Sequence, residues 1–130
     1  MYKLFSVKEA NNLIPVVDEL LGDMQDAIRD TYQLRDEIAT LGAHSVAARN
    51  KAQEVAFLLR SAHETKADLD RLGVFLKDVD TGVVDFPSQV GAEVVYLSWE
   101  KGQDAITHYH RLNEGSRLPL GGAPEQSLAL

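Results

Sequence analysis

The sequence predicts an α+β fold in which a long antiparallel helical hairpin is followed by a small antiparallel sheet of three to four strands. Between residues 6 and 73, apolar side chains recur three and four positions apart, which is the spacing of an amphipathic helix. After Gly73 the apolar period changes to two, which is the spacing of a β-strand. The length of 130 residues suits one domain. We expect this domain to span residues 1–120, with the hairpin at 6–73, the sheet at 74–112 and a disordered tail at 121–130.

The first helix is expected to begin at a capping box, because in Ser6-Val7-Lys8-Glu9 the side chains of the first and last residue can each bond the other's backbone N–H. Its apolar pattern continues to Leu41, and Gly42 stands where a left-handed residue would end it. Pro15 lies inside this stretch and has no N–H to donate. Two alternatives follow: a kink in one helix, or a short helix over residues 7–14 and a long one that begins at Pro15.

The second helix is predicted from an apolar run between Ala48 and Leu69, and Gly73 closes it. Residues 42–45 form a short linker, so the two helices must be antiparallel neighbours. Together the helices carry an apolar stripe too wide for one contact, since it extends to residues such as Ile28 and Phe57. We therefore expect a homodimer through the hairpin, with four helices packed in the manner of a coiled coil.

The strands are recognised by β-branched and aromatic residues between turn signals. Pro87 is expected to stop the second strand, residues 89–92 to form a loop, and residues 105–111 to form a fourth strand or a short helix. Trp99 and Tyr96 fall on opposite faces, with Trp99 in the core against the hairpin. The three predicted strands cover residues 74–79, 83–86 and 93–100.

The composition excludes several classes of function. The net charge of -7 argues against a nucleic-acid partner and against an anionic membrane surface. There is no cysteine, which excludes disulfides, thiolate nucleophiles and cysteine-ligated metals. The absence of a spanning apolar run and of a signal peptide predicts a cytoplasmic protein. No phosphate-binding loop, dinucleotide fingerprint, nucleophile elbow or zinc-protease motif is present, so we expect no cofactor.

A candidate metal site is the pair His108 and His110, which would project to the same face of a strand. A carboxylate from Asp78, Asp80 or Asp85 would complete a set of two histidines and one carboxylate. The alternative is a surface or hydrogen-bonded histidine pair without a metal.

A second candidate site joins Asp85, His110 and Arg117. If these side chains converge, they make an acid–base pair with a clamp for an anion. Asp85 should point away from the face taken by Val84 and Phe86. The alternative is structural: Asp85 caps the turn at Pro87 and pairs with Arg117.

The order of motifs resembles a bacterial family catalogued as domain of unknown function 2203. The likeness rests on Phe5 to Asn11, on Val84-Asp85-Phe86-Pro87, on Tyr96-Leu97-Ser98-Trp99 and on Tyr109-His110, and it extends to Leu120. The family is uncharacterised, so the resemblance implies a fold but no activity. Family members usually show cysteine, glutamate and tryptophan where this chain has Ser98, Gln103 and Tyr109, and the segment at 114–118 is shorter. If the family's site used that glutamate as an acid, base or ligand, Gln103 would be unable to replace it.

Two functional hypotheses result. The first is a non-catalytic, dimeric interaction or regulatory protein built on the hairpin, for which an unidentified protein partner is a further option. The alternative is a small metal-dependent or acid–base enzyme that acts on an anionic small molecule, with a site on the sheet around Asp80, Asp85, His110 and Arg117.

Overall fold

The computed structural model describes residues 3–112 and 117–120, and it confirms the α+β class. Helices α1 (Val7–Ala39) and α2 (Val46–Leu72) form the hairpin. The sheet is antiparallel with strand order β1-β2-β3-β4-β5, one strand more than predicted. The tail predicted at 121–130 lies outside the described residues. The strands are β1 (Phe75–Asp78), β2 (Val83–Val90), β3 (Glu93–Glu100), β4 (His108–Arg111) and β5 (Leu118–Pro119).

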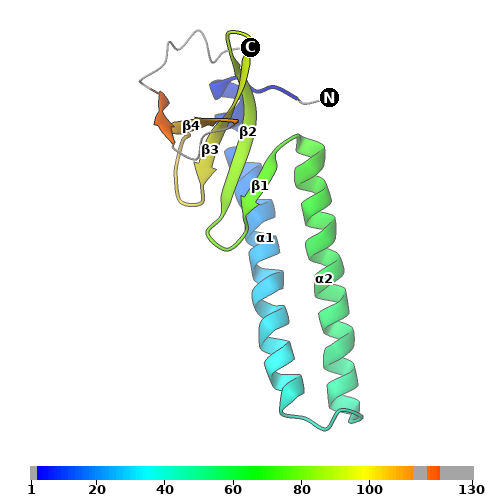
Figure 1. Ribbon diagram of the computed structural model, residues 1–130. Helices are drawn as coiled ribbons and strands as arrows, with labels where there is room; N and C mark the ends of the chain where they lie inside the picture. Colours follow the sequence, from blue (N-terminus) through cyan, green and yellow to red (C-terminus); the bar gives the residue numbers. More distant parts are fainter. Residues whose placement is uncertain (1–2, 113–116, 121–130) are drawn as a thin grey trace.

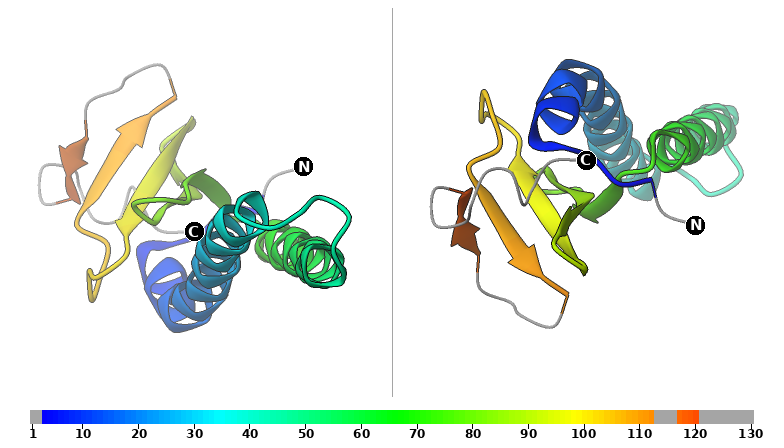
Figure 2. Two further views of the ribbon diagram at one scale, coloured as in Figure 1. Left: turned by 90° about the horizontal axis from the view of Figure 1, so that it is seen from below. Right: turned by 90° about the horizontal axis from the view of Figure 1, so that it is seen from above.

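The sheet lies at one end of the helical hairpin, so the molecule is broad at that end and narrow at the other. Figure 1 shows the sheet beside the N-terminal half of α1, while the far half of the hairpin extends beyond the sheet. In the two end-on views of Figure 2, α1 lies between the sheet and α2. Helix residues of the main core extend along α1 as far as Ile28 and resume on α2 at Ala62. We call residues 29–61, which lie beyond these two positions, the projecting end.

The core joins α1 to one face of the sheet. Val17 and Leu21 of α1 are fully buried, as are Phe86 and Leu97 of the sheet. Trp99 is 1% exposed, as predicted for a core residue, and its indole N–H donates to the carbonyl of Gln103 at 2.9 Å. Burial of an indole in this way satisfies its polar atom while the ring excludes water. Other members of this core are Phe5, Ala10, Ile14, Met24, Leu69, Val74, Val84, Val95, Ile106 and Tyr109.

Helix α1 begins at the predicted capping box. Ser6 N–H donates to the Glu9 carboxylate and Glu9 N–H donates to the Ser6 hydroxyl, both at 3.0 Å. Of the two alternatives for Pro15, the structure shows one continuous helix through this residue. Pro15 is exposed, so the carbonyl that loses its helical donor lies on the solvent side of the helix.

The connection between the helices differs in part from the prediction. Gly42 does not end α1; Thr40 caps it, in a right-handed conformation, and its hydroxyl donates to the Glu37 carbonyl at 2.8 Å. Ser45 caps α2 by accepting from Ala48 N–H at 3.1 Å. Gly73 ends α2 with φ of 88°, as predicted.

The prediction that Pro87 stops a strand is wrong, because β2 runs through it to Val90. β1 pairs with β2 only as far as Asp85, so beyond that point one edge of β2 is open to the N-terminal segment. The Pro87 carbonyl accepts from Phe5 N–H at 2.7 Å on this edge. Because N and C=O of a strand residue point the same way, the missing N–H falls outside the pairing with β3. The predicted loop at 89–92 shrinks to a two-residue turn, with Gly91 at φ of 57°.

The region predicted as a strand or helix at 105–111 contains the strand β4, which begins at His108. β5 was not predicted, because two residues carry no periodic signal. Within the described part of the chain, neither helix has an apolar stretch that would cross a bilayer.

Candidate functional site

Asp85 lies on the face of the sheet turned away from α1, which we call the outer face. Its neighbours Val84 and Phe86 belong to the core, so the alternation along β2 places Asp85 outward, as predicted. In register, Asp85 stands opposite Phe75 of β1 and Ser98 of β3. Although it lies on the outer face, Asp85 is only 2% exposed. A carboxyl group is rarely so buried without a partner or a function.

Asp85 and His110 form a hydrogen bond, 2.9 Å from Oδ2 to Nε2. They belong to β2 and β4, so the bond spans the strand between them. The residue of that strand in register with Asp85 is Ser98, which has a short side chain. Tyr96 lies two residues before Ser98 on the same face of β3, and its ring lies against His110, with ring centroids 5.3 Å apart. Asp85 and His110, two of the three residues of the hypothetical acid–base site, are thus in contact in the structure.

One proton lies between the two groups. Either His110 donates Nε2–H to the carboxylate, or a protonated Asp85 donates to Nε2. His110 Nδ1 lies 3.3 Å from the Arg111 carbonyl.

The second oxygen of Asp85 is buried without a hydrogen-bond donor. Within the described part of the chain, Oδ1 accepts no hydrogen bond. Burial raises the pKa of Asp85, and the hydrogen bond from His110 and the charges of His110, Lys77 and Arg117 oppose this rise only in part. A buried carboxylate oxygen without a donor is costly, so Oδ1 is the atom of this site most in need of a ligand.

The raised pKa makes a prediction about stability. Folded protein holds the Asp85 proton more tightly than unfolded chain, so this group stabilises the fold fully below about pH 3.9, its unfolded value. That contribution is lost as the pH rises through the folded pKa. The wild type should therefore lose stability relative to Asp85→Asn as the pH rises from about 4 to 8, which urea unfolding of both proteins at each pH will measure.

The control for this prediction is Glu9, whose pKa is shifted in the opposite direction. Bonds from the backbone and side chain of Ser6 lower the pKa of Glu9, so its carboxylate stabilises the fold at high pH and stops doing so as the pH falls through the folded pKa. The wild type should gain stability relative to Glu9→Gln as the pH rises. A stability difference for Asp85→Asn that is flat, or that has the sign of Glu9→Gln, would contradict the assignment.

Arg117 and Lys77 bring positive charge to the edge of the site. Both act on Asp85 through their charges rather than through a direct bond. Arg117 directly precedes β5, and its Nη1 lies 3.6 Å from Glu100 Oε1. In the structural alternative, Arg117 pairs with Asp85, and Asp85 caps a turn at Pro87. The contacts of Arg117 and Asp85 in the structure differ from this arrangement.

The described part of the structure brings two of the proposed metal ligands, Asp85 and His110, together, but not a third. His108 and His110 share the outer face, but His108 Nδ1 lies 2.8 Å from the Thr107 hydroxyl. Asp78 caps the turn between β1 and β2 by accepting from the N–H groups of Asp80 and Thr81. Among residues 3–112 and 117–120, no group of three or more potential ligand side chains is placed to hold a metal ion.

Comparison with known families decides what the chain is related to. The family model described as "Uncharacterized conserved protein (DUF2203)" matches residues 3–118. The chain belongs to this family. Neither the curated proteins nor the solved structures compared with the chain give a match.

The positions at which this DUF2203 chain was expected to depart from its family fall in different places. Ser98 lies on the outer face beside Asp85, and Tyr109 lies in the core. Gln103 has a structural role, because its side-chain oxygen accepts from Glu100 N–H at 3.1 Å and its carbonyl accepts from Trp99. Gln103 is therefore engaged in the turn after β3.

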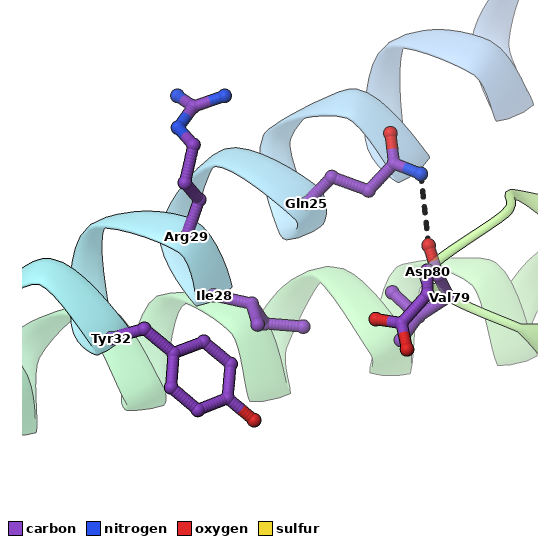
Figure 3. Close-up of a pocket in the computed structure, with 6 residues that line it drawn as sticks. All are labelled: Gln25, Ile28, Arg29, Tyr32, Val79 and Asp80. Atoms are coloured by element: carbon purple, nitrogen blue, oxygen red, sulfur yellow. Dashed lines mark hydrogen bonds between the residues drawn. The ribbon is translucent and has the colours of Figure 1, made fainter.

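A groove in the DUF2203 chain lies where the sheet leaves the hairpin. One surface pocket of about 450 Å³ is shown in Figure 3, where Gln25 donates to the Val79 carbonyl at 2.8 Å. An adjoining pocket of about 490 Å³ shares Ile28 and Val79 with it. Asp80 lines this groove and not the site at Asp85. The remaining lining residues are Arg29 and Tyr32 of the first pocket and Met24, Leu59, Ala62, His63, Lys66 and Leu76 of the second.

Sequence reasoning missed Phe75, Tyr96 and Ser98 as neighbours of Asp85, and it missed the groove. The period-two alternation does place Tyr96 and Ser98 on one face of β3. Their position beside Asp85 depends on the register of β2 with β3, which no local pattern of the sequence specifies.

Proposed function

We propose that this protein is a non-catalytic interaction protein that associates with a second copy of itself through the hairpin. The observation that carries the proposal is the sparse burial of α2. Of its 27 residues, only Ala48 and Leu69 are buried. A helix in a globular protein normally buries a continuous apolar stripe, so α2 lacks a partner on much of its surface.

The apolar residues left open are concentrated on the projecting end. Tyr32 and Val46 are each 64% exposed and Phe57 is 63% exposed, with Leu59 at 44%. Single exposed apolar residues are ordinary, but four large ones on a stretch this short favour an interface. The groove at the branch of hairpin and sheet adjoins this surface, since Tyr32 and Leu59 also line it.

The charges of the projecting end favour a second copy over an unrelated partner. Its part of α1 carries more acid than base, and its part of α2 carries more base than acid. A two-fold axis can set α1 of one copy against α2 of the other, so the same surface complements itself. In α1 the charged residues are Asp30, Asp36 and Glu37 against Arg29 and Arg35, and in α2 they are Arg49, Lys51 and Arg60 against Glu54.

The Asp85–His110 pair is the observation that favours the alternative, an acid–base enzyme. Both nitrogens of His110 already have hydrogen-bonding partners. No atom of the imidazole is left to take a proton from a substrate, which general base catalysis by this group would require. The geometry therefore supports binding better than catalysis.

Single cysteines test the proposal cleanly, because the chain has none of its own. We would place one cysteine at a time at exposed positions 53, 56 and 60 of α2, and one at exposed Thr107 on the sheet as the control. With a short bis-maleimide, at least one hairpin variant should give a covalent dimer in high yield and Thr107→Cys should not. Equal yields at all four positions, or no dimer at any, would contradict association through the hairpin.

A further inference from the structure

The outer face of the sheet carries a buried acceptor that none of the described residues satisfies. Asp85 Oδ2 shares a hydrogen bond with His110 Nε2, but Oδ1 has no partner among residues 3–112 and 117–120 even though Asp85 is 2% exposed. An ionised carboxylate can only accept, so a ligand for Oδ1 must bring a hydrogen. This requirement is independent of the hairpin and of any dimer.

Positively charged side chains act on Asp85 from neighbouring segments of the chain. Lys77 from β1 and Arg117 before β5 both act on Asp85, and His110 from β4 shares a proton with it. Glu100 of β3 balances Arg117, at 3.6 Å. His108, also on β4, is engaged by Thr107. A ligand that fits must therefore combine negative charge for Lys77 and Arg117 with a hydrogen for Asp85.

We propose that Asp85, with Lys77 and Arg117, forms a binding site for a protonated phosphate group. Such a group meets both requirements, because its P–O–H donates to Oδ1 while its other oxygens accept from ammonium and guanidinium groups. Near neutral pH inorganic phosphate always keeps at least one such hydrogen. Sulfate is also a tetrahedral anion, but it has no hydrogen to donate. One of its oxygens would therefore face Oδ1, and the two negatively charged oxygens would repel each other.

The same logic separates free phosphate from a phosphate monoester. A monoester loses its last P–O–H with a pKa of about 6, so above that pH it no longer has a hydrogen for Asp85. Free phosphate should bind at both about pH 5.5 and about pH 7.5. A monoester such as glycerol 3-phosphate should bind at the lower pH and weaken sharply at the higher one.

Access to Oδ1 is controlled by aromatic side chains on the strand surface. Phe75 is the in-register neighbour of Asp85 on β1, so its ring lies beside the carboxyl group. Phe75 is 39% exposed and contacts Tyr96 edge-on, with centroids 5.9 Å apart. Exposed side chains change rotamer without unfolding the backbone, so the proposed site requires Phe75 to turn aside when phosphate binds.

The experiment is isothermal titration of the full chain with inorganic phosphate and, separately, with sulfate. Wild type should bind phosphate with a Kd of about 1 mM or tighter, and at least about tenfold tighter than sulfate. Asp85→Asn keeps the size of the side chain and a partner for His110, but its amide also donates. In that variant the preference for phosphate over sulfate should fall to about one.

Two arginine variants complete the test. Arg117→Gln should weaken phosphate and sulfate alike, by about threefold to tenfold, and leave their ratio unchanged. Arg71→Gln removes the same charge from an exposed position of α2 and should change neither. Absence of saturable phosphate binding to wild type up to about 10 mM would overturn the proposal. Equal binding of phosphate and sulfate, or an unchanged preference in Asp85→Asn, would do the same.

Discussion

Replacing Phe57 by glutamate is expected to convert the proposed dimer into a monomer while leaving the helix content unchanged. In a single chain this side chain is 63% exposed, so its replacement removes little that holds the hairpin together. In the dimer the same position would carry a buried, unpaired charge. Buried aromatic residues at interfaces contribute about 2 kcal/mol or more, so the Kd should rise at least about 30-fold.

Sedimentation velocity over a series of concentrations measures this change. The matched control is Asn12→Glu, which adds the same charge to an exposed position of α1 beside the sheet. We expect that control to remain dimeric. If Phe57→Glu dimerises as the wild type does, the interface lies elsewhere on the chain.

Replacing Trp99 by alanine is expected to lower the free energy of unfolding by about 3–5 kcal/mol. Trp99 is 1% exposed and packs in the core that joins α1 to the sheet. Its loss also leaves the Gln103 carbonyl without the indole donor. Because α1 contributes to this core, helix and sheet should unfold together.

Urea unfolding at one protein concentration, followed by circular dichroism in the helix and sheet regions, tests this expectation. The control is Tyr96→Ala, which removes a half-buried ring from the opposite face of the same strand and should cost less. A cost below about 1 kcal/mol for Trp99→Ala, or two separate transitions, would show that hairpin and sheet do not share one core.

Local signals in the sequence predicted the helices and most of the sheet. The capping box at Ser6 and the glycine stop at Gly73 are local chemistry, and both are present. The change to an apolar period of two after Gly73 is also a local signal, and it identified β1 and β3. The stop expected at Gly42 did not occur, because Thr40 offered a hydroxyl cap two residues earlier.

The errors arise where tertiary contacts override a local rule. A proline such as Pro87 is typical of a strand end, yet its missing N–H falls on an edge of β2 whose partner is Phe5, more than 80 residues away in the chain. β5 exists because it pairs with β4, and two residues carry no pattern of their own. No local sequence pattern predicts either of these contacts.

The candidate site was predictable in part. Alternation around Val84 and Phe86 correctly placed Asp85 on the outer face. The burial of Asp85 was not predictable, because it comes from neighbours in β1, β3 and β4 whose register is set by the whole sheet. His110 reaches Asp85 across β3, where Asp85 has the short side chain of Ser98 as its in-register partner.

The most direct test of the interaction hypothesis is native mass spectrometry of the untagged chain at micromolar concentration. We predict a species with twice the 14.4 kDa mass of one chain, which reverts to the single mass in Phe57→Glu. A wild-type protein that has the mass of one chain at every concentration would contradict the hypothesis, because the apolar surface of the projecting end would then need another partner.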